Sequence, residues 1–554
     1  MHGQAFGAQC RWRVGGGGRS RALGTHPAVR VPSSRLAVRA ADLLAEPGPA
    51  GIVGGIDAGL CRVCRGPALD PQGGPVSIAT AVALEWSRLR RDAVVWTAIA
   101  VLTVALAYGL GNGYAWQRFQ REAIAQAATL EQATIAAARS EAQRLDRLAG
   151  QEIDPFSDPR HALGFESEYL QQYDCLQPTP LAMMAVGQSD LLPYCVRVTT
   201  GPWPSFVASY EWENPLRLLL GRFDCAFVVI YLLPLLILAI SFNVLSRERE
   251  LGTLPLLFSY PVTPRRWLAV GLGLRAALLI GVTIAVALAG LWWTGADPTG
   301  APSLLRFGLW AAAVGAYALF WFGLAWWVNA RRKSSAVNAL TLAGAWLLLV
   351  ILAPALLNAG VKQVYPLPSR VAFINALRNA TAESEKEGSG LLKKYMQDHP
   401  ELAPGDPAQA ADDYVRVLLA VNAQTERVLA PSQQRFQQQI DRQQRLIDRL
   451  SVVSPAILVQ QAGNAVSGTD QRRHLRFLES VARHRLEVKA FFDPKFVADD
   501  RFDAYDGIPK FRPDDVPLPD VARTVLSAVI LLCLLTALCV VMGWRALRRP
   551  LFEP

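Results

Sequence analysis

Residue types that could carry out catalysis occur in this sequence, but their spacing builds no recognisable reactive site. His474 and His484 share one probable helix, yet neither i, i+3 nor i, i+4 spacing brings the two imidazoles together. The glycine run Gly15 to Gly18 leads into Arg19-Ser20 and lacks the lysine with which a Walker A loop contacts phosphates. Neither a GxSxG elbow nor an HExxH metal motif occurs. We therefore expect no catalytic residue, no bound metal and no directly bound cofactor, and we do not expect an enzyme.

The eight cysteines do not form a zinc-binding quartet. Cys61 and Cys64 make a lone CxxC, which lacks a second pair and is best explained by chance. Cys175 and Cys195 could form a disulfide if their segment lies in an oxidising compartment. Such a bond would close a loop of about twenty residues and contribute about 3 kcal/mol. Two unrelated buried thiols are the alternative.

The composition indicates a membrane protein. The chain of 554 residues is 51% apolar and only 18% charged, whereas soluble domains usually carry about 25% charge. Six apolar runs are long enough to span a bilayer. They lie at Ala93–Leu110, Cys225–Leu245, Leu268–Trp293, Leu305–Val328, Val337–Leu357 and Val521–Trp544. The third run contains one intramembrane polar residue, Arg275, which we expect to snorkel to the headgroups.

The basic residues predict the orientation of these spans. Short clusters flank them at Arg88–Arg91, Arg247–Arg249 with Arg265 and Arg266, Arg331–Lys333, and Arg545–Arg549. With six spans, all four clusters fall on one side, which the positive-inside rule makes cytoplasmic. Both termini are then inside, in a multi-pass protein of the cell's inner (plasma) membrane. Basic clusters beside spans are topology signals, so we do not expect a nucleic-acid partner.

The remaining segments complete the predicted organisation. Residues 1–76 are rich in Gly, Arg and Pro and predict a disordered extension, with translation starting nearer Val76. Residues 77–113 hold an amphipathic helix and the first span. The apolar face of the amphipathic helix is formed by Ile78, Val82, Trp86 and Leu89. This face suits the membrane surface on the cytoplasmic side.

Two long segments, 114–223 and 359–519, are left outside the membrane. The first opens with a helix, Gln117–Leu148, that continues the first span. The second contains a helical stretch, Ala411–Leu450, which we expect Pro431 to interrupt. Asp224 sits at the outer end of the second span, where water or headgroups should reach it. The two segments together predict a large, mostly helical extracytoplasmic domain, so the fold class is an all-α integral membrane protein.

Residues 224–358 carry the second to fifth spans, and residues 520–554 the sixth span with a cytoplasmic tail. The connector 246–266, within SRERELGTLPLLFSYPVTPRRW, joins the second span to the third. Arg247 to Glu250 alternate in charge and can pair within one turn, and Gly252 permits a bend. Leu254 to Phe258 form an apolar patch outside any span, which is unfavourable unless something covers it. Pro261 ends the segment. A turn resting on the bilayer surface is the alternative to a partner-binding connector.

The connector resembles that of ABC-2 type permeases, the membrane subunits of ABC exporters, in which an E-x-G-T element follows the second span. In that family the connector forms a coupling helix that docks on a separate ATP-hydrolysing subunit. The resemblance carries this role to Glu250, Gly252 and Thr253, with Pro261 matching the proline that usually follows. The expected ATPase-coupling residues are then Arg247, Glu248, Arg249, Glu250, Gly252, Thr253, Leu254 and Pro261. The segments AVGQSDLLPY, SPAILVQQAGN, FFDP and IPKF look more narrowly like ABC-2 permeases that carry a DUF3526 region.

The resemblance implies a permease subunit without its own ATPase, in the lipid bilayer of the inner membrane. Its expected partners are an ABC ATPase subunit, which would use ATP and Mg, and a second permease, either itself or a related chain. A mechanotransmission or scaffold subunit is the alternative. Such a subunit would use ATP-driven motion to act on an envelope protein without transporting a substrate. The sequence leaves the substrate open.

Overall fold

The computed structural model describes residues 78–148, 157–201, 222–253, 263–295, 301–366, 370–387, 414–498 and 501–548. Among the residues singled out in the sequence, Cys61, Cys64, the apolar patch Leu254 to Phe258 and Pro261 lie outside these ranges. The predicted extension 1–76 lies outside them as well.

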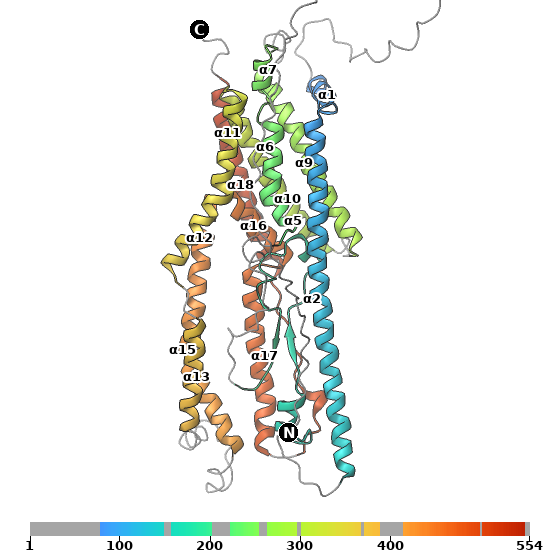
Figure 1. Cartoon of the computed structure of the whole chain (residues 1–554), viewed down its shortest axis with the longest axis vertical. Coiled ribbons are helices and arrows are strands. Elements are labelled where there is room, and N and C mark those ends of the chain that lie inside the picture. Colours follow the sequence, from blue (N-terminus) through green and yellow to red (C-terminus); the bar gives the residue numbers. More distant parts are fainter. Residues whose placement is uncertain are drawn as a thin grey trace, which may run out of the picture. The chain divides into compact units, whose positions relative to one another are not determined.

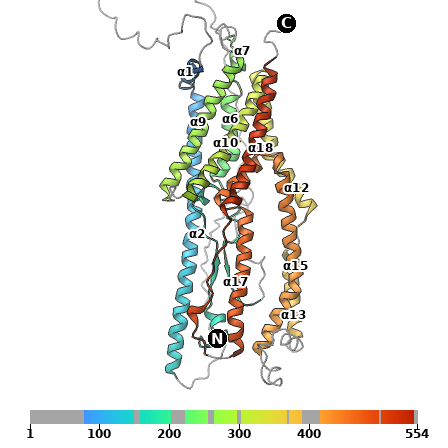
Figure 2. The same cartoon turned by 180° about the vertical axis from the view of Figure 1, so that it is seen from behind.

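The described part of the chain is largely helical, and six of its helices are long and apolar enough to cross a membrane. They can be followed in Figures 1 and 2. The first is α2 (Ala93–Arg147), and the second combines α5 (Cys225–Phe227), η3 (Val228–Leu232), α6 (Leu233–Ser241) and α7 (Ser246–Glu250). The others are α9 (Pro264–Trp293), α10 (Ala301–Ala330), the helix formed by α11 (Ser335–Trp346), η4 (Leu347–Leu352) and α12 (Ala353–Val364), and α18 (Leu518–Ala546). These six helices confirm the six apolar spans and indicate a membrane protein.

Capping side chains explain where several of these helices begin. The Asp92 carboxylate accepts a hydrogen bond from the backbone N–H of Val94 at the start of α2. The Thr263 hydroxyl accepts from the N–H of Arg266, and proline occupies the first position of α9. Each oxygen satisfies a donor that the first helical turn leaves without a partner.

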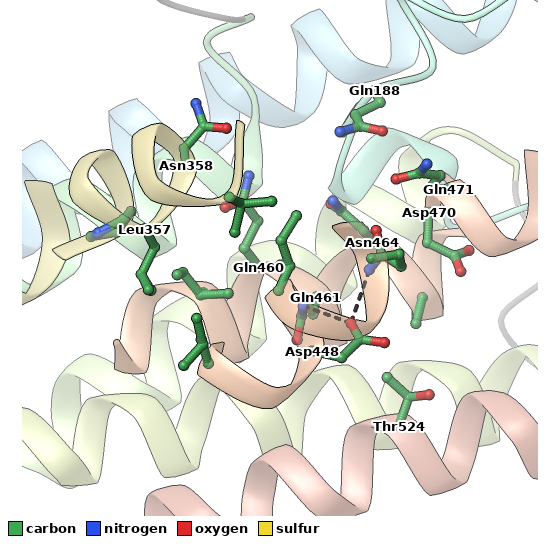
Figure 3. A pocket seen from close by; sticks show the side chains of 18 of the residues that line it. Gln188, Leu357, Asn358, Asp448, Gln460, Gln461, Asn464, Asp470, Gln471 and Thr524 are labelled. Atoms are coloured by element: carbon green, nitrogen blue, oxygen red, sulfur yellow. Dashed lines mark hydrogen bonds between the residues drawn. The ribbon is translucent and has the colours of Figure 1, made fainter. Parts of the chain in front are cut away.

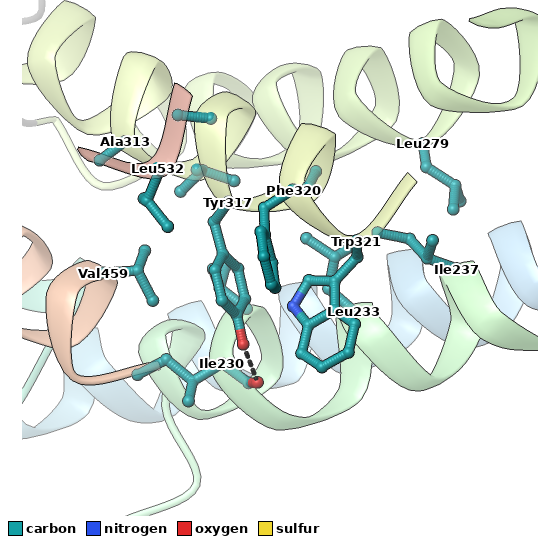
Figure 4. Packing of buried hydrophobic residues seen from close by; sticks show 14 of the residues in the cluster. Ile230, Leu233, Ile237, Leu279, Ala313, Tyr317, Phe320, Trp321, Val459 and Leu532 are labelled. Carbon is teal, nitrogen blue, oxygen red and sulfur yellow. Dashed lines mark hydrogen bonds between the residues drawn. The ribbon is translucent and has the colours of Figure 1, made fainter. Parts of the chain in front are cut away.

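The helix α10 is the centre of the apolar packing. In the most apolar stretch of α10, 72% of the residues are buried inside the chain. In the corresponding stretch of the helix Ser335–Val364, only 11% are buried. Tyr317 and Trp321 of α10 are fully buried, and Figure 4 shows them packed with residues of α6, α16 and α18. The most extensive helix contact of α10 is with α18, where a Cβ on Gly543 would lie 2.4 Å from the Trp326 ring. A residue without a side chain allows this approach.

The amphipathic helix is present as α1 (Ile78–Leu89), and the face that it turns to the protein includes a charged residue. Ala81, Glu85 and Leu89 are buried, whereas Val82 is exposed. Glu85 forms an ion pair with Arg275 of α9 at 2.6 Å, and both side chains are shielded from solvent. The snorkelling predicted for Arg275 is therefore wrong, because a buried carboxylate from another helix neutralises the guanidinium.

The segments between spans form their own packed elements. The first holds α3 (Ala162–Gly164), η1 (Phe165–Tyr169), β1 (Tyr173–Cys175), η2 (Ala182–Met184) and β2 (Cys195–Arg197). The second holds α13 (Arg370–Lys386), α15 (Tyr414–Leu450), η7 (Ser451–Val453), α16 (Pro455–Ser467), α17 (Gln471–Ala498) and η8 (Tyr505–Gly507). In the described ranges the one sheet is the antiparallel pair β1–β2, in which Cys175 faces Cys195 and the two form a disulfide.

An aromatic core joins these two segments. It consists of Phe165, Phe492, Phe496, Phe502 and Tyr505, all buried. Phe165 from the first segment lies 5.1 Å from Phe502 and 5.0 Å from Tyr505, measured between ring centroids. Aromatic rings at such separations gain about 0.5–1.5 kcal/mol a pair beyond the area they bury. The two segments thus share one hydrophobic cluster.

Two predictions about these segments are wrong. Pro431 lies inside α15, which continues to Leu450 without a break. Proline removes one helical hydrogen bond, but α15 also packs against α12, α13 and α17, and such tertiary contacts provide most helix stability. Asp224 is buried rather than open to water, because its carboxylate accepts hydrogen bonds from the backbone N–H groups of Phe227 and Val186, at 2.7 and 2.8 Å.

Candidate functional site

The described part of the connector consists of α7 with the turn that follows it and of residues 263–266 at the start of α9, and Glu250 is the main attachment of α7. One Glu250 carboxylate oxygen accepts from the backbone N–H of Ser335 at 2.7 Å, and the other accepts from the Ser335 hydroxyl at 2.7 Å. Ser335 is the first residue of α11. A carboxylate at this position satisfies a free helix N–H and also interacts favourably with the positive end of the helix dipole. Glu250 thereby joins the end of the second span to the start of the fifth.

Two neighbours of Glu250 hold α7 from other directions. The Arg249 guanidinium donates to the backbone carbonyl of Arg332. Glu248 pairs with Arg88 of α1 at 3.0 Å and also accepts from the Thr253 hydroxyl at 2.6 Å. We call Arg88, Glu248, Arg249, Glu250 and Ser335 the connector network. It links α7 to both α1 and α11.

The turn after α7 depends on Gly252. Its φ of +71° is left-handed, a conformation that glycine adopts without strain. The Gly252 N–H donates to the Arg249 carbonyl, and the Thr253 N–H donates to the Glu248 carbonyl. The bend expected at Gly252 is therefore present. Beside it, the side chains of Arg247, Arg249, Glu250 and Leu251 are exposed, and Leu251 is an apolar side chain with 64% of its surface accessible.

Contacts join three of the four basic clusters of the sequence, and another contact reaches Trp544, next to the fourth. The Arg88–Glu248 and Arg249–Arg332 interactions join the clusters before the first span, after the second and after the fourth. The Arg265 guanidinium lies 4.7 Å from the centre of the Trp544 ring, so the start of the third span meets the end of the sixth. Below α7, the buried Asn329 side chain donates to the Ser241 carbonyl at 2.9 Å and anchors the end of α6 to α10.

Two helical segments within the spans are π-helical, and the sequence did not indicate them. They are η3 in the second span and η4 in the fifth. A π-turn bonds residue i to i+5, which leaves carbonyls without α-helical partners, and such turns are frequent at functional sites.

Side chains from neighbouring elements bind carbonyls of both π-helices. The Tyr317 hydroxyl donates to the carbonyl of Ile230 at 2.9 Å (Figure 4). Trp346 donates to Tyr231 at 3.3 Å, and Ser454 to Leu349 at 2.6 Å. No aromatic or serine spacing in the sequence reveals these bonds, because each joins residues that are far apart in the chain.

A pocket of about 640 Å³ lies beside both π-helices. Tyr231 of η3 and Val350 and Ile351 of η4 line it, together with residues of α12, α15, α16 and α17. Figure 3 shows its polar side chains converging from these helices. The pocket residue Pro354 is 19 residues beyond Ser335 on one helix, which corresponds to about 28 Å of helical rise. The connector network and this pocket therefore contact different ends of the helix Ser335–Val364.

His474 and His484 are both buried on α17 and do not meet. His484 bonds Asp174 of β1 at 2.9 Å and the Pro509 carbonyl at 3.1 Å. Burial lowers the pKa of His474 to about 4 and raises the pKa of Asp174. Across the described residues, no group of three or more His, Cys, Asp or Glu side chains is arranged to hold a metal ion.

A family model for DUF3526, a domain of unknown function, matches residues 370–514. This match bears out the DUF3526 region of the resemblance, and it includes α13, α15, α16 and α17, which supply much of the pocket and of the aromatic core. No curated protein and no solved structure matches the chain.

Proposed function

We propose that the chain is the membrane-spanning permease subunit of an ABC-2 type exporter. In this proposal it couples ATP hydrolysis by a separate ATPase subunit to the export of a substrate, and it does no catalysis itself. The observation that carries the proposal is the attachment of Glu250 to Ser335, which ties an exposed five-residue helix to the first residue of a span. A displacement of α7 would therefore displace the start of α11.

The exposed surface of α7 suits the docking of a second protein. Leu251 is exposed beside Arg247 and Arg249, so the surface combines an apolar side chain with positive charge. Exposed ion pairs such as Arg88–Glu248 contribute about 0–1 kcal/mol each, less than a partner can supply through differential binding. ATP binding by the docked subunit would then shift the chain between two arrangements of its spans.

The proposed orientation has α7 and both termini in the cytoplasm of a cell with an inner membrane. It is supported by the contacts that join the basic clusters, because these contacts gather the arginines near the same span ends. The segments with the aromatic core and the disulfide would then form the extracytoplasmic domain. A second permease, either another copy or a related chain, completes the proposed complex.

The test begins with purification of the tagged full-length chain from its own cells. The expected result is that a subunit with ATPase activity copurifies with it. In the reconstituted complex, Glu250→Ala combined with Gly252→Trp should leave the chain inserted and assembled but uncouple ATP hydrolysis from export. Glu122→Ala is the matched control, because Glu122 is an exposed glutamate of α2 that pairs with Arg118. Unchanged coupling in the double variant, or the absence of any copurifying ATPase, would overturn the proposal.

The aromatic core favours one other function, a mechanotransmission subunit. The segments outside the spans are large and share a hydrophobic cluster of their own, so they could act as a rigid lever on an envelope protein. A reconstituted complex that hydrolyses ATP and binds an envelope protein, but transports nothing, would select this function.

A further inference from the structure

The pocket beside η3 and η4 has a polar lining dominated by uncharged carboxamides. Six of them are Gln188, Asn358, Gln460, Gln461, Asn464 and Gln471. Each carboxamide offers both donors and an acceptor, which matches hydroxyl groups, since a hydroxyl also donates and accepts. Within the described part of the chain, Gln188, Asn358, Gln460, Asn464 and Gln471 have no side-chain hydrogen bond to protein, so these groups are available to a ligand.

The charged groups in the pocket are already engaged with one another. Arg472 is the one basic residue among the described lining residues, and it pairs with Asp448 at 2.6 Å. Asp448 also accepts from Gln444 at 2.9 Å and from Gln461 at 3.2 Å. Burial raises the pKa of Asp470, which favours its uncharged form. A phosphate or carboxylate would therefore find no free cation here.

The opposite wall of the pocket is apolar and belongs to the least buried span. It is formed by Val350, Ile351, Pro354 and Leu357. Next to this wall, Leu356 is 69% exposed, as expected for a side chain that faces lipid. An alkyl chain could lie along this helix while its head group reached the carboxamides.

We propose that this pocket binds an amphiphile with an uncharged polyhydroxy head and an alkyl tail, of the glycolipid class. The volume of about 640 Å³ falls within the roughly 300–1,000 Å³ of small-molecule sites. The π-helices give an independent indication, because such helices are frequent at functional sites, and Trp346 and Ser454 donate to carbonyls of η3 and η4, respectively, beside the pocket. The inference rests on the proposed function only in treating this amphiphile as the cargo, because binding itself requires no ATPase.

The experiment measures ligand binding to the full-length chain in phosphatidylcholine nanodiscs by native mass spectrometry. The probes are octyl β-D-glucoside, octyl phosphate and methyl β-D-glucoside, each titrated below micelle-forming concentrations. Octyl glucoside should bind saturably, whereas octyl phosphate should bind at least about tenfold more weakly because its charge is unmatched. Methyl glucoside should also bind more weakly than octyl glucoside, since it lacks the tail. Equal binding of methyl glucoside would contradict the lipid class and indicate a free sugar.

The matched variants are Gln460→Leu with Asn464→Leu, and Gln434→Leu. Gln460 and Asn464 lie one turn apart on α16 at the pocket, whereas Gln434 is an exposed glutamine of α15 outside the lining. The double variant should weaken octyl glucoside binding by about tenfold, as expected for the loss of two hydrogen bonds, and Gln434→Leu should not. Unchanged binding in the double variant would overturn the proposal. If that variant fails to fold, equal affinity of the wild-type chain for octyl phosphate and octyl glucoside would overturn it instead. Neither failure bears on ATPase coupling, because no ATPase is present.

Discussion

The connector network and the aromatic core both join helices that are distant in the sequence, but they do so with different physical interactions. In the connector network, Arg88, Arg249 and Glu250 are exposed and interact through an ion pair and hydrogen bonds. In the aromatic core, Phe165, Phe492 and Phe502 are buried and interact through ring contacts. Exposed polar contacts exchange readily with water and with a partner's side chains, whereas buried rings have no such alternative.

This difference assigns the two regions different mechanical roles. Rearranging the connector network involves interactions of about 0–1 kcal/mol each, so a partner protein could do it. Opening the aromatic core would expose several large rings at about 1.5–3 kcal/mol each. We therefore expect the core to move as a rigid body and the connector network to change its contacts.

The largest expected effect comes from Phe492→Ala. Phe492 is fully buried, and its ring centroid lies 5.6 Å from that of Phe496 and 5.7 Å from that of Phe502. Removing the ring should lower the free energy of unfolding by about 3–5 kcal/mol. Thermal unfolding of the full-length chain measures the change. Phe119→Ala is the control and should have a much smaller effect, because Phe119 is 43% exposed. Equal effects of the two substitutions would show that the core is not the rigid part.

Reduction of the Cys175–Cys195 disulfide should have the next largest effect. The bond closes a loop with a sequence separation of 20, so its loss should destabilise the chain by about 3 kcal/mol. A shift of the unfolding temperature on adding reductant measures it. Cys175→Ser with Cys195→Ser should show the lower stability and no response to reductant. A response that persists in this variant would point to the remaining cysteines.

Acid should weaken this same part of the molecule through His474. The pKa of His474 is lowered to about 4 by burial, whereas an unfolded histidine has a pKa of about 6.5. Between these values the unfolded chain binds the proton and the folded chain does not, so stability falls as the pH falls. From pH 6.5 to pH 5 the loss should be about 2 kcal/mol. The free energy of unfolding should depend less steeply on pH in His474→Leu than in the wild-type chain. Identical slopes in the two proteins would contradict the assignment to His474.

Much of the fold follows from local patterns in the sequence. The six spans are predicted by apolar length alone, and the continuation of α2 to Arg147 by its alanine-rich composition. The start of α9 at Pro264 follows from Thr263 as its N-cap. The connector's bend follows from Gly252. Each of these features depends on residues within a few turns of one another.

The features that the sequence did not predict depend on contacts between distant segments. The pairing of Glu85 with Arg275 could not be expected from the sequence, because nothing local in α1 indicates that an arginine 190 residues away needs a carboxylate. Asp224 is buried because the backbone of Val186 binds it. The pocket combines carboxamides from several helices, and no one of these helices carries a motif for it. Such sites become visible only when the helices are packed.

The smallest change in stability, and the sharpest test of the comparison, is expected from Ser335→Ala. The substitution removes the hydroxyl that donates to Glu250, but it keeps the backbone N–H that donates to the other carboxylate oxygen. The same hydroxyl also bonds the hydroxyl of buried Ser246 at 2.8 Å, so the free energy of unfolding should fall by about 1 kcal/mol, the net value of a hydrogen bond. If the proposed coupling is correct, the ratio of transport to ATP hydrolysis should still fall, though less than in Glu250→Ala, because one of two attachments remains. Ser140→Ala removes an exposed hydroxyl of α2 that bonds the Ala137 carbonyl and no other group among the described residues, so it should leave the ratio unchanged. If Ser335→Ala lowers stability but leaves coupling unchanged, the connector network stabilises the fold, as the aromatic core does, and does not move during coupling.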